Sequence, residues 1–183
     1  PNSASLILYT PDYEIIRGPF TPADNEEHFQ LWTPVMMGDE LVIELQVAPS
    51  KKEAVQLQLS SVNHDFIGFF DPQSGSCNLD VICGTGDGWE VVEDYRDIIQ
   101  SVAMYTLNGI RQCTGFLVNN ARQDCTPFFM TADHCSVTAG AAPSVVAFWN
   151  YESPTCRQPN TPASGNVNVG NLDIFNTGAI LRA

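Results

Sequence analysis

The sequence predicts an all-β protein built from two modules, and three observations support this. Only 16% of the 183 residues are charged while 44% are hydrophobic, and 13 Gly and 12 Pro favour short strands joined by turns. Several short segments alternate apolar and polar residues with the period of two typical of half-buried strands. All six cysteines lie after residue 76, which separates a cysteine-free part from a cysteine-containing part.

The first module, residues 1–73, is predicted to be a small antiparallel β-sandwich. Its strand candidates are rich in apolar residues, and they cover residues 5–9, 41–47, 55–59 and 66–69. Turn residues, including Gly18-Pro19 and Gly38-Asp39, separate these candidates. Residues 71–76, Asp-Pro-Gln-Ser-Gly-Ser, form a turn-rich linker, so the domain boundary is placed at 73/74.

The second module, residues 74–183, contains more strand candidates. A short helical stretch after Asp94 leads into a strand at 102–105. Further strands are predicted at 112–118, 127–131 and 144–149, and a long Pro/Asn/Gly-rich loop at 154–171 precedes a last strand at 174–181.

The charge balance narrows the function classes. With 21 Asp+Glu against 8 Lys+Arg, the net charge is −13, which disfavours nucleic acid and anionic membrane surfaces as partners. The longest apolar run near the start, Leu6–Leu8, is too short for a membrane span or a signal peptide. Because the chain begins at Pro1, we expect either a removed leader or a fragment with boundaries at both ends.

The cysteines indicate an oxidising compartment, because they are even in number and clustered. The alternative is a set of buried free thiols in a cytosolic protein. None of the cysteines has the C-x-x-C spacing of a zinc site, so a zinc hydrolase is disfavoured. We expect neither a metal nor another cofactor.

Three histidines are candidates for chemistry. His28 lies in an acidic loop, where a solvated side chain is expected, and His64 lies beside a strand candidate, where a structural hydrogen bond is expected. His134 differs because it directly follows an apolar strand, within Thr131-Ala132-Asp133-His134-Cys135.

Two strings together resemble motifs of the chymotrypsin-fold serine proteases. Cys113 to Val118 resembles C-x-G-x-L-V, and Thr131 to Cys135 resembles T-A-x-H-C. More specifically, residues 74–83 and 146–165 look like the opening half of bacterial lysyl endopeptidases. This resemblance implies that residues 74–183 form the first half of a chymotrypsin-like double β-barrel. Asp133 departs from the Ala or Gly common at its position in trypsins.

Residues before the linker also resemble the β-rich propeptide of related secreted bacterial proteases. The strings that carry this less specific likeness are 17–21 and 31–34.

The resemblance implies that His134 is the general base of a catalytic triad. A serine hydroxyl becomes a good nucleophile only when an imidazole takes its proton and a carboxylate orients that imidazole. The chain ends before the family positions of the triad Asp and Ser, and neither Asp173 nor Ser164 has the family context. The 183-residue chain alone is therefore expected to be inactive.

The family pattern also implies two disulfides, Cys113–Cys135 and Cys83–Cys156. In relatives the counterpart of Cys77 bridges to the second barrel half, which is absent here, whereas Cys125 has no family counterpart. Cys77 and Cys125 therefore either pair with each other or stay free.

These features predict a secreted or cell-surface serine endopeptidase. Its expected partners are a polypeptide substrate and the missing C-terminal half of the same protease. The alternative is a non-catalytic pseudoprotease or a surface-assembly component on the same scaffold.

Lys51 and Lys52 are the only lysines, although residues 53–183 contain five arginines. A protease that cuts after lysine would spare such a chain beyond residue 52, so cleavage after Lys is preferred over cleavage after Arg. The other explanation is an acidic composition that happens to lack lysine.

Overall fold

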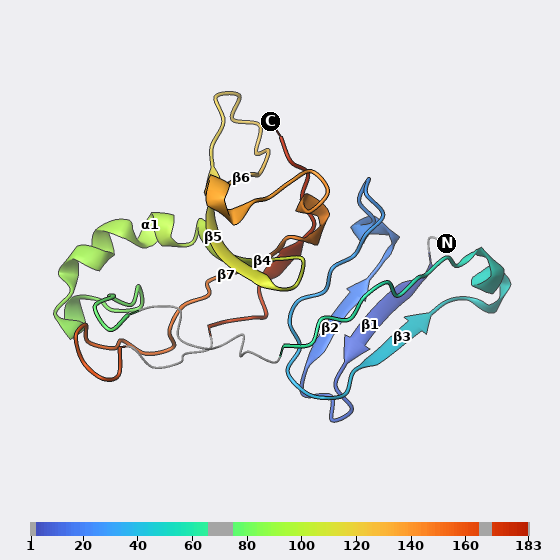
Figure 1. Cartoon of the computed structure of the whole chain (residues 1–183), viewed down its shortest axis with the longest axis horizontal. Coiled ribbons are helices and arrows are strands. Elements are labelled where there is room, and N and C mark those ends of the chain that lie inside the picture. Colours follow the sequence, from blue (N-terminus) through green and yellow to red (C-terminus); the bar gives the residue numbers. More distant parts are fainter. Residues whose placement is uncertain (1–2, 66–74, 165–169, 183) are drawn as a thin grey trace.

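Two antiparallel sheets make up the regular structure of the chain, as a computed structural model shows for residues 3–65, 75–164 and 170–182. The predicted all-β fold class is therefore confirmed. Helical segments in this part of the chain are short, and they comprise α1 (Arg96–Ile99) and several 3₁₀ turns. Figure 1 shows the three-stranded sheet of the first module beside the five-stranded sheet of the second.

The first sheet has the strand order β2-β1-β3. β1 (Ser5–Tyr9) coincides with the predicted strand at 5–9, and β3 (Val42–Gln46) lies within the predicted strand at 41–47. The two strands pair without interruption in an antiparallel register. β1 is therefore the central strand, with β2 and β3 as its neighbours.

The sequence did not predict β2 (Ile16–Phe20), because Gly18-Pro19 indicates a turn. Both residues lie inside the strand, at a register shift that falls between Leu6 and Leu8 of β1. Gly18 has a φ of 106°, and a Cβ there would lie 2.7 Å from the carbonyl oxygen of Leu6. Proline fits because β2 is an edge strand, where a missing N–H costs no ladder hydrogen bond.

The predicted strand at 55–59 was wrong. This segment follows the 3₁₀ turn η2 (Pro49–Ala54), and it pairs with no strand among the described residues. Leu57 and Leu59 are 58% and 67% exposed, so the alternating pattern covers no core. The candidate strand at 66–69 and most of the linker at 71–76 lie outside the described residues.

The second sheet has the strand order β6-β5-β4-β7-β8. All its predicted strands are present, the last one shortened: β4 (Val102–Leu107), β5 (Arg111–Val118), β6 (Phe128–Thr131), β7 (Val146–Trp149) and β8 (Phe175–Thr177). β8 ends at Thr177, because the next residue, Gly178, has a φ of 79° that departs from strand geometry. Within the described ranges β6 and β8 are the edges, so the sheet is open.

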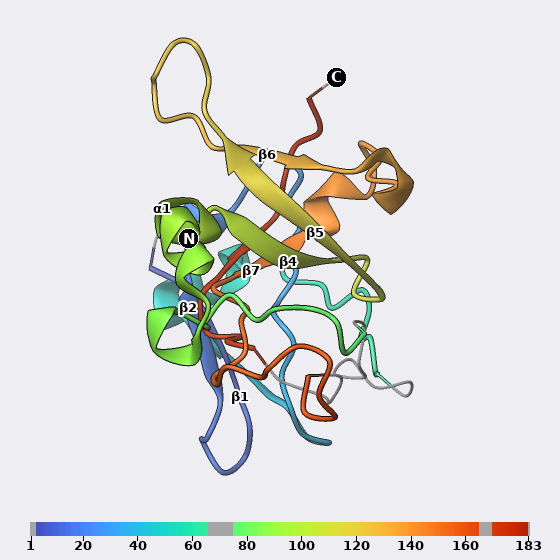
Figure 2. The ribbon, with the colours of Figure 1, turned by 90° about the vertical axis from the view of Figure 1, so that its left-hand side faces the viewer.

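The two faces of this sheet are covered by different parts of the chain. On one face, residues of β4 and β7 pack around Tyr105 together with Cys135, which follows β6. On the other face Val146 and Phe148 of β7 pack with Leu172, and Trp32 and Val35 of the first module lie against them. Figures 1 and 2 show the chain between β2 and β3 passing beside β7. The same sheet thus carries His134 on one side and binds the first module on the other.

Candidate active site

The strand that leads to His134 is held firmly in the sheet. Thr131, the last residue of β6, pairs with Gly115 of β5. Its hydroxyl donates to the carbonyl oxygen of Thr114 (2.9 Å) and lies 3.0 Å from the hydroxyl of the buried Tyr105. A Cβ at Gly115 would lie 2.8 Å from the carbonyl oxygen of Met130. Glycine at this motif position therefore lets β5 and β6 approach each other closely.

His134 lies in a tight 3₁₀ turn, η5 (Asp133–Cys135), directly after β6. The turn ends at Ser136, whose φ of 57° is left-handed. Cys135 is only 6% exposed within the core, and the disulfide Cys113–Cys135 joins it to β5. The turn is thus fixed at Thr131 on one side of His134 and at Cys135 on the other.

The imidazole of His134 itself is exposed. An open hollow adjoins it, lined by Leu107, Gln112, Cys113, His134, Cys135 and Ser136. The part of the chain that the structure describes provides no hydrogen-bond partner for the imidazole nitrogens. A histidine held in this way is free to accept a proton from a group that approaches from outside.

The other acidic and hydroxyl candidates lie elsewhere. Asp173 is 77% exposed and pairs with Arg17 of the first module at 2.9 Å, not with His134. Ser164 is only 2% exposed, and its hydroxyl donates to the carbonyl oxygen of Asn78. Both side chains therefore hold other parts of the chain together.

The remaining histidines differ in their surroundings. His64 is exposed. His28, expected to be solvated, is instead partly buried, and its Nδ1 accepts the backbone N–H of Gln30 at 3.2 Å. Its Nε2 lies against Gly178, at the end of β8. The acidic residues next to His28 in sequence indicated a solvent-exposed side chain. Nothing in that stretch of sequence indicates the contact of His28 with the second sheet.

Cys113, His134 and Cys135 place their donor atoms within 4.8 Å of one another. The two sulfur atoms are joined in a disulfide, so neither is a thiolate that could bind a metal ion. This group therefore offers a single metal ligand, the imidazole of His134.

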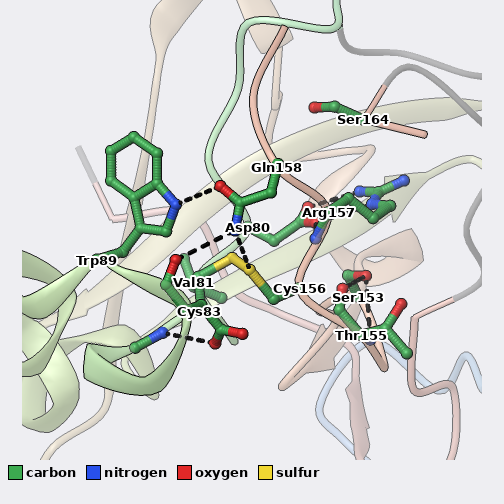
Figure 3. Close-up of a disulfide and its surroundings, with 12 residues drawn as sticks. Asp80, Val81, Cys83, Trp89, Ser153, Thr155, Cys156, Arg157, Gln158 and Ser164 are labelled. Carbon is green, nitrogen blue, oxygen red and sulfur yellow. Dashed lines mark hydrogen bonds and ion pairs between the residues drawn. A yellow bond between two sulfur atoms is a disulfide. The ribbon is translucent and has the colours of Figure 1, made fainter. Parts of the chain in front are cut away.

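A second anchoring region lies where the loop after β7 contacts residues 78–89 (Figure 3). The disulfide Cys83–Cys156 joins the two segments, and Cys83 is fully buried. Next to it, the guanidinium of Arg157 donates to both carboxylate oxygens of Asp80, at 2.8 Å from Nε and 2.6 Å from Nη2. The backbone N–H of Arg157 donates to the same carboxylate at 2.9 Å.

An indole hydrogen bond extends this contact. Figure 3 shows the Trp89 indole N–H donating to the side-chain oxygen of Gln158, at 2.9 Å. The side-chain amide of Gln158 in turn donates to the backbone carbonyl of Asp87. The start of the second module is therefore fastened to the long loop by one covalent and several polar contacts.

Comparison with known proteins identifies the family. Residues 72–182 match the family model for the C-terminal domain of lysyl endopeptidase, and this range is more than half of the chain. The chain belongs to the lysyl endopeptidase family. A lysyl endopeptidase from Pseudomonas aeruginosa is 27% identical to it over 160 residues. That alignment covers 78% of this chain but 34% of the relative, so the chain spans about a third of the relative's length.

Both disulfides that the resemblance to lysyl endopeptidases implied are confirmed, Cys83–Cys156 and Cys113–Cys135. Cys77 and Cys125 are free and exposed.

The pair of Asp80 and Arg157 was missed by the sequence analysis, although a signal existed. Arg157 follows Cys156 and Asp80 precedes Cys83 by three residues, so pairing these cysteines brings the two charges together.

The pair of Asp80 and Arg157 predicts an acid-sensitive contribution to the stability of this chain. Hydrogen bonds from Arg157 lower the pKa of Asp80, and the two side chains are only 11% and 18% exposed. The contribution is therefore complete above the ordinary Asp pKa of about 3.9 and is lost as the pH falls through the lowered folded value. At pH 7, Asp80→Asn is expected to reduce the free energy of unfolding by about 2 kcal/mol.

Chemical denaturation of both proteins across a pH series measures this difference. The gap between wild type and Asp80→Asn should narrow as the pH falls below about 4. Asp39→Asn is the matched control, because Asp39 is exposed and should show no such gap. A gap independent of pH would contradict the ionic role of Asp80.

Proposed function

We propose that the complete protein is a secreted serine endopeptidase that hydrolyses peptide bonds on the carboxyl side of lysine, with His134 as its general base. The observation that carries this proposal is the placement of His134. It is exposed beside an open hollow, while a strand end and a buried disulfide fix the turn that bears it. Membership of the lysyl endopeptidase family supports the same reaction.

In this mechanism the imidazole of His134 accepts the proton of a serine hydroxyl as the serine oxygen attacks the substrate carbonyl. The imidazole then gives the proton to the leaving amine, and water releases the acyl group by the same route. An aspartate on the second imidazole nitrogen would hold the ring in the correct tautomer. We assign the serine and the aspartate to sequence beyond residue 183, so the present chain is expected to be inactive alone.

Exposed arginines support specificity for lysine over arginine. Arg122 lies in the loop between β5 and β6, its side chain is 74% exposed, and it forms an ion pair with Asp124 in the same loop. Figures 1 and 2 show this loop projecting from the sheet. An enzyme that cut after arginine would cleave its own chain a few residues before the strand that leads to His134. Residues 53–183 contain no lysine, so a lysine-specific enzyme would spare this module.

The proposal includes an extracellular or cell-surface location. The two disulfides support it, because disulfides form and persist mainly in oxidising compartments outside the cytosol. Among the described residues, no helix is both long and apolar enough to cross a membrane. The partners are a polypeptide substrate and the second half of the same protease, to which the exposed Cys77 is proposed to bridge. Residues 1–73 are proposed as a separate N-terminal module.

Peptide pairs that differ only in Lys or Arg at the cleaved position test the proposal on the complete protein. The value of kcat/KM is expected to be at least about tenfold higher for the Lys peptide, because a pocket fitted to one side chain discriminates against the other. Faster cleavage after Arg, or after an apolar residue, would overturn the specificity. Complete absence of peptidase activity would favour the non-catalytic scaffold instead.

A further inference from the structure

A buried tyrosine hydroxyl reaches the strand that leads to His134. Tyr105 of β4 is fully buried, and its hydroxyl oxygen lies 3.0 Å from that of Thr131, the last residue of β6. In the sheet β5 separates these two strands (Figure 2), so the contact spans a whole strand. It connects the core of the second module with the residue three positions before His134.

The direction of this hydrogen bond follows from the available protons. The Thr131 hydroxyl has one proton and donates it to the backbone carbonyl oxygen of Thr114, at 2.9 Å, and a carbonyl can only accept. The Tyr105 hydroxyl is therefore the donor to the Thr131 oxygen. Two consecutive hydrogen bonds thus link β4 to β6 and β6 to β5, and they fix the orientation of the Thr131 side chain.

The ring of Tyr105 is packed so that its hydroxyl meets Thr131. The ring of Phe129 stands edge-on to it, with ring centres 5.6 Å apart and an interplanar angle of 83°. Phe129 makes a second edge contact with Trp149, at 5.9 Å. A Cβ at Gly115 would overlap the Phe129 ring, so the glycine of β5 leaves the space that this ring fills. Such edge contacts hold the tyrosine ring, and with it the hydroxyl, in one place.

The same tyrosine is connected with the other end of the turn that carries His134. Tyr105 pairs with Cys113 across β4 and β5, and Cys113 forms the disulfide with Cys135. Cys135 also belongs to the core cluster that contains Tyr105. The turn is therefore attached to Tyr105 by a hydrogen bond before His134, and by strand pairing and packing after it.

Packing alone does not require a hydroxyl at this position. A phenylalanine ring would fill the core equally well, whereas a buried hydroxyl costs free energy unless a partner satisfies it. A satisfied buried hydroxyl instead selects one arrangement of the groups that it joins. The imidazole of His134 has no hydrogen-bond partner among the described residues, so its position depends on the backbone on either side.

We propose that Tyr105 is a positioning residue for the general base. Its hydroxyl, acting through Thr131, holds the turn η5 so that the imidazole of His134 stays within reach of the serine hydroxyl. This inference rests on the proposed function and deepens it. Tyr105 takes no part in the proton transfers. Since a displacement of about 1 Å at a catalytic group can cost about 10²-fold in rate, a smaller shift of the turn is expected to cost about tenfold.

Tyr105→Phe in the complete protein removes only the hydroxyl. On a lysine peptide, kcat should fall about tenfold while KM stays within about twofold, because the general base moves and the substrate contacts do not. Thr131→Val keeps the side-chain shape without the hydroxyl and should give the same loss, whereas Thr131→Ser keeps a hydroxyl and should retain most of kcat. A kcat within about twofold of wild type for Tyr105→Phe would overturn the proposal.

A double-mutant cycle shows whether the two hydroxyls act together. Tyr105→Phe combined with Thr131→Val should lower kcat by about tenfold, as each single change does, and a loss of about 100-fold would overturn the linkage through Thr131. Asp80→Asn is the matched control for lost stability, because it breaks a polar contact beside the other disulfide. Its kcat should stay within about twofold of wild type, and a tenfold loss there would assign the effect of Tyr105→Phe to stability.

Amide hydrogen exchange on the present chain reports on the turn without any activity. The backbone N–H groups of Cys135 and Ser136 close η5 by donating to carbonyl oxygens at 3.0 and 2.8 Å. Tyr105→Phe should speed their exchange by about tenfold, because the turn opens more readily. The turn η3 (Thr85–Asp87) is the control, and the exchange of the Gly88 N–H that closes it should not change.

The two measurements separate the possible failures. Unchanged exchange in η5, or equal acceleration in η3, would overturn the positioning role while the proposed function stands. A complete protein without peptidase activity would overturn the proposed function, and the exchange rates would still decide whether Tyr105 holds the turn. Should Tyr105→Phe fail to fold, the comparison of Thr131→Val with Thr131→Ser provides the same test.

Discussion

Replacing His134 with alanine in the complete protein is expected to lower kcat by about 10⁴-fold or more and to leave KM within about threefold. The loss follows because the serine hydroxyl would keep its proton and the leaving amine would receive none. Substrate binding should change little, since the imidazole acts mainly on the reacting atoms. Steady-state kinetics on a lysine peptide measures both constants.

Folding should survive this substitution. His134 is exposed, whereas the neighbouring Thr131 and Cys135 supply the contacts that fix the turn. His64→Ala is the matched control, because His64 is equally a surface histidine and lies in the first module. Near-normal kcat for His134→Ala, with His64→Ala also normal, would exclude His134 as the general base.

The environment of His134 could be predicted because its determinants are local in sequence. The apolar strand, the Thr131 to Cys135 string and the glycine of β5 all lie within about two dozen residues of one another, and a hairpin brings them together. Such local patterns specify a strand pair and its turn. The open, solvent-facing position of His134 then follows from its place after the last residue of β6.

The first module was harder to predict because its features depend on distant contacts. Gly18-Pro19 forms part of β2 only because β2 is an edge strand whose register shifts between Leu6 and Leu8 of β1. The segment at 55–59 has the alternation of a strand, but no neighbouring edge covers its apolar residues. Alternation shows that a segment is compatible with a sheet. It does not show that a neighbouring strand is available for pairing.

Contacts between the two modules had no sequence signal at all. Arg17 meets Asp173, and His28 meets Gly178, across more than a hundred residues of chain. Nothing in the acidic loop around His28 distinguishes a solvated imidazole from one that packs on a strand end. Only the fold, which places the chain between β2 and β3 beside β7 and β8, decides between them.

Removing the two disulfides one at a time is expected to separate stability from catalysis. Cys83–Cys156 closes 73 residues of sequence and Cys113–Cys135 closes 22. Loop-closure entropy then predicts losses of about 4 and about 3 kcal/mol in the free energy of unfolding for the respective double alanine variants. Alanine suits the buried Cys83 because it introduces no polar atom.

In the complete protein, the loss of kcat/KM should follow the opposite order to the loss of stability. Loss of Cys113–Cys135 frees one side of the turn that carries His134, and a displacement of about 1 Å at a catalytic group can cost about 10²-fold in rate. Loss of Cys83–Cys156 leaves the ion pair of Asp80 with Arg157 to hold its segment, so kcat/KM should stay closer to wild type. Each variant serves as the control for the other. Equal losses of kcat/KM in both would show that the disulfide beside His134 acts on stability alone and does not position the general base.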